Sequence, residues 1–176
     1  MASTDKYGHY ADGNRPAERA RQHGYRYCMI SENIVTVYSS AGFTTAELTR
    51  QFFQGWKHSP SHRENMLAPN VLKTGVAVAW SEQTGSYYGV QVFGRPQSKM
   101  ITFEIVNRST ADLHYEIAGR TFPLPPGFSR THGRCQPVEV ATQWPDERER
   151  TIVQPQNGNR YTIVEEDSRR LTIVEN

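Results

Sequence analysis

The chain has 176 residues, of which 36% are hydrophobic and 22% charged, and its formal net charge at pH 7 is +2. This length fits one ordinary domain or two small ones, and so small a charge does not indicate nucleic acid or an anionic membrane as the partner. The first twelve residues are too polar for a signal peptide, and no apolar stretch is long enough for a membrane span.

Helical patterns dominate the first part of the chain. Residues 14–24 predict a short helix, and residues 44–59 predict a longer amphipathic helix in which Thr44 and Glu47 form a capping box. A second short helix is predicted over residues 60–67, where a proline follows a capping serine. The longer helix gathers its aromatic side chains on one face, and we expect these in the core: Phe52, Phe53 and Trp56.

The hydrophobic period then changes from that of a helix to two residues. Residues 74–80 and 87–93 both alternate and are separated by a turn, which predicts a β-hairpin. Residues 94–99 have the composition of a linker. We therefore expect one domain over residues 1–96 and a second over residues 97–176.

The second predicted domain contains six or seven short segments of alternating apolar residues, separated by turn clusters. Strands at this spacing are typical of a small all-β antiparallel sandwich or barrel. The segment matches no family that we can name. Its two histidines, His114 and His132, are expected at the surface.

The two cysteines, Cys28 and Cys135, lie far apart in the sequence. They have neither metal-ligand spacing nor a C-x-x-C pattern, which excludes zinc-ribbon and thioredoxin-like sites. Two interpretations stay open at this point. The residues are either two buried free thiols or one long-range disulfide, and a disulfide requires an oxidising compartment.

Three polar residues are candidates for chemistry. His9 lies in a loop, Glu32 interrupts an apolar stretch, and His62 is the third residue of the capped helix, where the helix dipole favours a neutral imidazole. Two imidazoles and a carboxylate can bind a divalent metal such as zinc, or act as a general base. Taken alone, each residue is more typical of a surface, capping or hydrogen-bonding role, and no local motif holds the three together.

Five segments, taken in chain order, resemble the bacterial branch of the CAP family, which comprises cysteine-rich secretory, antigen 5 and pathogenesis-related proteins. The segments are YGHYADGNRPAERARQHGY, SENIV, FFQGWKHSPSHRENML, TGVAVAW and YYGVQVFGRP. They cover the chain to about Pro96, and the block from the tryptophan to the leucine is the most specific. The resemblance implies an α-β-α sandwich with a cleft.

The family resemblance also implies roles for individual residues. His9 matches the loop histidine, Glu32 the glutamate of the E-N-I element, and His62 the histidine of the S-P-x-H-R block. In the family such residues cluster in the cleft and can bind a divalent metal. Arg63 and Asn65 match the same block, and we expect them to make structural hydrogen bonds.

The sequence departs from the family pattern at three residues. Ser31 replaces the glycine that usually precedes the glutamate. Tyr88 and Ser59 lie near the positions at which eukaryotic members have a second cleft histidine and a second cleft glutamate. We expect Tyr88 and Ser59 to line the cleft as binding residues.

Family members usually begin with a long amphipathic helix that ends near the position of Met1. The resemblance therefore implies an α+β chain, with a CAP-type α-β-α sandwich lacking its first helix and a small all-β domain behind it. Without that helix, apolar surface on one face of the sheet would be exposed. Because the family is mostly exported, we expect an extracellular or periplasmic protein.

Three functions are compatible with these observations. The favoured one is a secreted binding module whose cleft holds a small ligand, lipid or peptide, and whose β domain meets a cell-surface component. The second is a metal-assisted hydrolase in which His9 and His62 hold the ion and Glu32 activates water. The third is a structural or assembly protein in which the exposed apolar face meets a partner.

Overall fold

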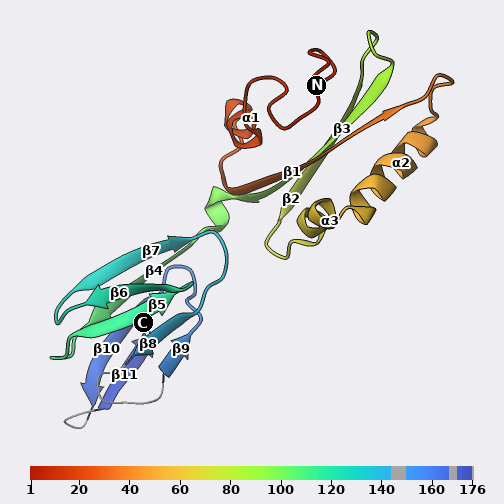
Figure 1. Cartoon of the computed structure of the whole chain (residues 1–176). Helices are drawn as coiled ribbons and strands as arrows, with labels where there is room; N and C mark the ends of the chain where they lie inside the picture. The colour runs from red at the N-terminus through yellow and green to blue at the C-terminus, as the bar shows by residue number, and fades with distance from the viewer. Residues whose placement is uncertain (144–149, 167–169, 176) are drawn as a thin grey trace. The chain divides into compact units, whose positions relative to one another are not determined.

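The computed structural model describes the backbone of residues 1–143, 150–166 and 170–175 (Figure 1). The contacts within it divide the chain into two compact units, Met1–Lys99 and Met100–Asn176. The division falls at the end of the segment whose composition predicts a linker.

The first unit is a three-stranded antiparallel sheet with helices on both faces (Figure 1). The predicted helices and hairpin are present, and the α+β class is confirmed. In chain order the elements are α1 (Pro16–Gln22), β1 (Tyr27–Tyr38), α2 (Thr45–His58), α3 (Pro60–Leu67), β2 (Lys73–Trp80), β3 (Ser86–Pro96) and the short 3₁₀ helix η1 (Gln97–Lys99). The strand order is β1-β3-β2, so β2 forms one edge of the sheet.

Helix α2 begins where the sequence predicts, at a capping box. The Thr44 hydroxyl accepts a hydrogen bond from the Glu47 N–H at 3.3 Å, and the Glu47 carboxylate accepts one from the Thr44 N–H at 2.9 Å. The helix then lies close to β3, since a Cβ on Gly89 would come within 2.6 Å of the Phe52 ring. Glycine is therefore required at this crossing for α2 to reach the sheet.

The core of the first unit is small. Its buried apolar side chains come from α2, β1 and β3, and they are Ile34, Phe52, Trp56, Tyr88 and Phe93. The prediction that Phe53 belongs to this core is wrong, because its side chain is 46% exposed. Neighbouring residues on a helix point about 100° apart, so Phe53 points away from the sheet contact that buries Phe52.

The second unit is a β-sandwich, as predicted. One sheet has the order β11-β10-β4-β7 and the other the order β6-β5-β8-β9. The strands are β4 (Ile101–Asn107), β5 (Leu113–Ile117), β6 (Arg120–Leu124), β7 (Ser129–Arg134), β8 (Val140–Gln143), β9 (Arg150–Val153), β10 (Arg160–Glu166) and β11 (Arg170–Glu175). The pairs are antiparallel except that β10 runs parallel to β4.

Among the residues whose burial the structure describes, nine apolar side chains from both sheets form the core of the second unit, and they are Phe103, Ile105, Leu113, Tyr115, Ile117, Leu124, Val140, Tyr161 and Ile163. His132 also lies in this interior with 6% of its surface exposed, so the prediction that it is a surface residue is wrong. Its Nε2 lies 2.6 Å from the Tyr115 hydroxyl, and the Phe103 and Phe122 rings contact its imidazole. The hydrogen bond to Tyr115 makes burial of this imidazole possible.

Both cysteines, Cys28 and Cys135, are disulfide-bonded in the structure. The interpretation of two free thiols is therefore wrong. None of the described helices combines the length and the apolar character that crossing a membrane requires.

Candidate functional site

A buried carboxylate on β1 organises the α1 side of the first unit. The Glu32 side chain is 2% exposed, and each of its oxygens contacts a cationic or ionisable group. Nδ1 of His9 lies 2.8 Å from Oε1, and the Arg19 guanidinium donates to Oε2 at 2.6 Å. The structure thus brings together two of the three predicted site residues, His9 and Glu32.

Arg19 ties this cluster to the loop that precedes α1. Besides Glu32, its guanidinium donates to the Asp12 carboxylate at 3.1 Å and to the carbonyl oxygens of His9 and Asn14. The Asn14 N–H, together with Arg19, holds the pKa of Asp12 below its usual value. A guanidinium with several oxygen acceptors is well suited to fix a loop in one conformation.

His62 lies on the other face of the sheet. Asn33 follows Glu32 along β1, and its side-chain amide donates to the His62 carbonyl at 2.9 Å. Asn65 on α3 donates to the Asn33 side-chain oxygen at 2.8 Å, a structural hydrogen bond of the kind expected for Asn65. Because successive side chains on a strand point to opposite faces, α3 and His62 face away from His9 and Glu32.

Tyr88 and Ser59 are separated in the same way. Tyr88 pairs with Thr36 across β3 and β1, on the sheet face that carries Glu32, and it is 6% exposed. Ser59 precedes the first residue of α3, on the opposite face, and its hydroxyl lies 3.5 Å from that of Ser61. Arg63, the remaining residue of the S-P-x-H-R block, is exposed.

These residues do not fit a zinc site. Catalytic zinc usually has three protein ligands and an open position, whereas His9 and Glu32 supply two, and Arg19 already bonds one Glu32 oxygen. Within the described part of the chain, no group of three His, Cys, Asp or Glu side chains lies close enough to hold a metal ion. The cluster is better described as an ion-pair network whose most exposed member is His9, at 44%.

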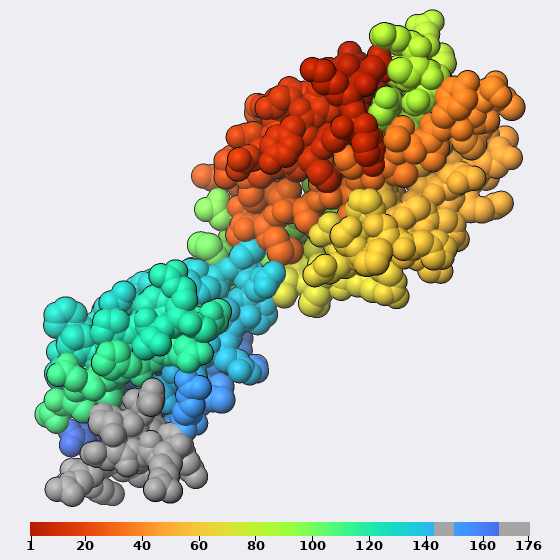
Figure 2. Space-filling model, viewed as in Figure 1, coloured from red at the N-terminus to blue at the C-terminus, as the bar shows by residue number. Residues whose placement is uncertain are grey.

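The other face of the same unit carries an apolar groove, which we call the α2 groove. It has a volume of about 500 Å³ and lies between α2 and the β2–β3 hairpin. Its apolar lining is Phe43, Leu48, Phe52, Phe53, Trp56, Val76, Val78 and Tyr87, and its polar lining is Thr45, Thr49 and Gln91. Figure 2 shows α2 and α3 in orange and yellow, and the N-terminal segment in red on the other side of the unit.

The family profile described as the cysteine-rich secretory protein family, CAP, matches residues 1–93, just over half of the chain. The chain belongs to the CAP family. No curated protein and no solved structure gives a significant match to the chain. The CAP match and the first compact unit end within a few residues of each other, so the first unit is the CAP unit.

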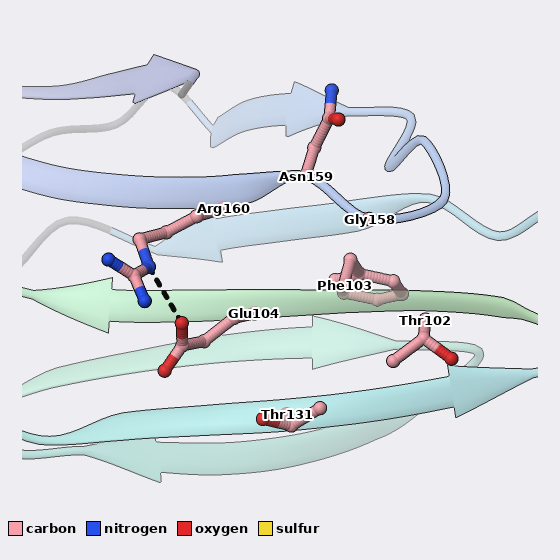
Figure 3. Close-up of a pocket in the computed structure, with 7 residues that line it drawn as sticks. All are labelled: Thr102, Phe103, Glu104, Thr131, Gly158, Asn159 and Arg160. Carbon is pink, nitrogen blue, oxygen red and sulfur yellow. Dashed lines mark hydrogen bonds and ion pairs between the residues drawn. The ribbon is translucent and has the colours of Figure 1, made fainter.

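The second unit lies outside the CAP match, and it has a polar hollow on the outer face of one sheet. The hollow has a volume of about 470 Å³, and its polar lining residues are Thr102, Glu104, Thr131, Asn159 and Arg160 (Figure 3). Arg160 donates to Glu104 at 2.7 Å, and the Ser129 hydroxyl and Arg160 lower the pKa of Glu104. Because Glu104 and Arg160 form an ion pair with each other, neither charge is left unpaired for a ligand. The hollow is therefore a weaker candidate for a binding site than the α2 groove.

Sequence reasoning missed the α2 groove of the CAP unit as a site. Val76 and Val78 belong to the predicted hairpin, but a residue pattern does not tell which strand forms the edge of a sheet. Phe53 is the residue that could have indicated the groove, because it is an aromatic residue next to the face of α2 that packs on the sheet.

Proposed function

We propose that this chain is an exported binding module whose CAP unit holds an apolar ligand, such as a lipid acyl chain, in the α2 groove. The shape and lining of the groove carry this proposal. Ligand sites typically have volumes of roughly 300–1,000 Å³ and are lined by apolar and aromatic side chains with a few polar groups. The α2 groove has eight apolar lining residues and three polar ones.

The energy available to such a ligand is moderate. Each buried methylene contributes about 0.8 kcal/mol, so eight methylenes in the groove contribute about 6 kcal/mol before the entropic cost of binding. Thr45, Thr49 and Gln91 offer hydrogen bonds to the polar end of the ligand. About 6 kcal/mol corresponds to a dissociation constant of roughly 40 μM, and the entropic cost weakens it, so we expect a dissociation constant on the order of 100 μM for a single-chain amphiphile.

Two observations support export from the cytoplasm. Cys28 and Cys135 are disulfide-bonded, and disulfides form and persist mainly in oxidising compartments. CAP proteins are also commonly secreted. We therefore propose an extracellular or periplasmic location.

The metal-assisted hydrolase has less support. Its three residues lie on two faces of the sheet, and Arg19 neutralises the carboxylate that would activate water. In a titration with zinc chloride, we expect the wild type and His9→Ala to behave alike, with no saturable binding that depends on His9. Stoichiometric zinc binding that depends on both His9 and His62 would instead support the hydrolase hypothesis.

Fluorescence titration with 11-(dansylamino)undecanoic acid tests the apolar site. Phe53→Asp introduces a charge into the groove at a half-exposed position, and we expect at least tenfold weaker binding of the probe. Leu67→Asp is the matched control, because Leu67 is 61% exposed on α3 and does not line the groove. Absence of saturable binding by the wild type, or equal affinities in the two variants, would reject the proposal.

A further inference from the structure

Strand β2 is an uncovered sheet edge. Within the described part of the chain it pairs with β3 alone, and all eight of its residues, Lys73–Trp80, are exposed. The side chains of Val76, Val78 and Trp80 are 60%, 49% and 54% exposed. They lie on the face that carries the α2 groove, and both valines line that groove.

The hydrogen bonding of β2 shows which backbone groups point outward. The Ser81 N–H donates to the Ser86 carbonyl at 2.9 Å, in line with the register that pairs Trp80 with Tyr87. Bonded and non-bonded pairs alternate in an antiparallel ladder, so the odd-numbered residues bond to β3. The even-numbered residues direct their N–H and C=O groups to the free edge, and these residues are Thr74, Val76, Val78 and Trp80.

The devices that usually keep a sheet edge unpaired are nearly absent from β2. It contains no proline, its register with β3 has no bulge, and its single charged residue is Lys73 at one end. Natural proteins protect long apolar edges with such devices, since an unprotected edge recruits another strand. The edge is therefore suited to strand addition.

We propose that two copies of this chain associate by antiparallel pairing of their β2 strands, joining their three-stranded sheets into one. A dyad at Ala77 places Val76 of each copy opposite Val78 of the other. In this register every outward-pointing residue of β2 finds a partner. A dyad at Val76 would use Leu72, whose N–H already donates to the Gly94 carbonyl at 3.0 Å.

The side chains of β2 are compatible with self-pairing in this register. Val76 and Val78 meet on one face, and the small residues Gly75 and Ala79 meet on the other. Lys73 is the only charged residue of the strand, and in this register it faces Ser81 of the other copy. The two Lys73 side chains therefore do not lie opposite each other. An opposed pair of like charges would disfavour the dimer.

The area involved is sufficient for a weak, specific dimer. Five side chains on and beside the edge are each about half exposed, and they are Phe53, Leu72, Val76, Val78 and Trp80. Covering them removes on the order of 1,000 Å² from water over both copies, which lies near the lower limit for a specific interface. We therefore expect a dimer with a dissociation constant in the micromolar range.

Light scattering after size exclusion, from 1 to 200 μM protein, measures the association. We expect the wild-type mass to rise toward twice that of the chain, and Val78→Pro to stay monomeric. Val78 directs its N–H outward, so proline there removes two bonds of the symmetric dimer, one from each copy, and none of the bonds to β3. Val78→Thr retains the N–H and should still dimerise.

Cysteine cross-linking tests the register without relying on proline. Directly opposed non-bonded residues have Cα atoms about 4.5 Å apart, within disulfide range. Ala77→Cys should therefore form a covalent dimer in air. Gly75→Cys, about 13 Å from its copy, should not, and a Cβ at Gly75 meets no atom within 4 Å.

A wild type that stays monomeric at 200 μM would overturn the proposal, and so would equal cross-linking by Ala77→Cys and Gly75→Cys. The backbone pairing uses the edge of β2, and Phe53, Val76 and Val78 belong both to the dimer surface and to the α2 groove. The mass and cross-linking experiments are therefore run without the dansyl probe, and the probe titration is run at protein concentrations at which the chain is monomeric. Failure of the dimer therefore leaves the acyl-binding titration unaffected, and failure of acyl binding leaves the cross-linking result unaffected.

Discussion

At the scale of single residues, Arg19 is the group on which the buried carboxylate of Glu32 depends. Arg19→Gln would leave that carboxylate with less compensation, and we expect the free energy of unfolding to fall by about 3 kcal/mol. Replacing both Arg19 and Glu32 by leucine should recover part of this loss. Urea denaturation followed by circular dichroism measures the free energy of unfolding of each variant. Arg63→Gln, on the exposed surface of α3, serves as the control. Equal effects of Arg19→Gln and Arg63→Gln would show that the ion pair does not stabilise the unit.

The buried imidazole of the second unit makes a pH-dependent contribution. Burial, together with Arg134 and Arg130, lowers the pKa of His132 to about 4, and burial raises the pKa of Tyr115 to about 12. An unfolded histidine titrates near 6.5, so the unfolded chain binds the proton first as the pH falls. This stability is therefore present above pH 6.5 and is lost progressively toward pH 4, by about 2–3 kcal/mol.

Denaturation at several pH values between 7 and 4 checks this expectation. His132→Gln should flatten the dependence, whereas His114→Gln, on the exposed side of β5, should leave it as in the wild type. Parallel pH profiles for the wild type and His132→Gln would contradict the assignment.

The cluster around Glu32 shows what sequence can predict at this scale. The closeness of His9 and Glu32 was predictable through the family resemblance, because no local pattern links residues on separate elements. The position of His62 was not predictable from the sequence. His62 contacts Asn33 and His9 contacts Glu32, and these adjacent residues of β1 point to opposite faces of the sheet. Glu32 and Asn33 are both buried, and each recruits its own partners.

At the scale of elements, the contact between α2 and β3 depends on Gly89. Gly89→Ala would place a methyl group 2.6 Å from Phe52 and 2.9 Å from Val35, so the helix must shift. We expect destabilisation by about 1–3 kcal/mol. Gly75→Ala, in exposed β2, meets no atom within 4 Å and should change stability by less than about 0.5 kcal/mol. Equal melting temperatures for the two variants would show that the crossing is not tightly packed.

The elements themselves were largely predictable from local chemistry. The capping box marked the start of α2, the alternation of residues 74–80 and 87–93 marked the hairpin, and short apolar runs marked the sandwich. The extent of β1 was hidden, since Glu32 and Asn33 break its apolar pattern. Their burial depends on Arg19, His62 and Asn65, which only the folded chain brings near.

At the scale of the whole molecule, the two units differ in the size of their cores. The CAP unit buries five large apolar side chains, whereas the second unit buries nine in one cluster among its described residues. We expect calorimetry to resolve two transitions, with the CAP unit unfolding at the lower temperature. An apolar ligand of the α2 groove should raise the lower transition alone. A single transition that shifts as a whole would contradict this assignment.

The parallel pairing of β4 with β10 determines when the sheet of the second unit can form during synthesis on the ribosome. Strand β4 is made early in its unit, yet its neighbour Arg160–Glu166 emerges more than fifty residues later. Until then the edge of β4 stays open while the CAP unit, already synthesised, can close its sheet. A nascent chain stalled before residue 160 would thus display a folded CAP unit followed by a segment still awaiting its partner strand.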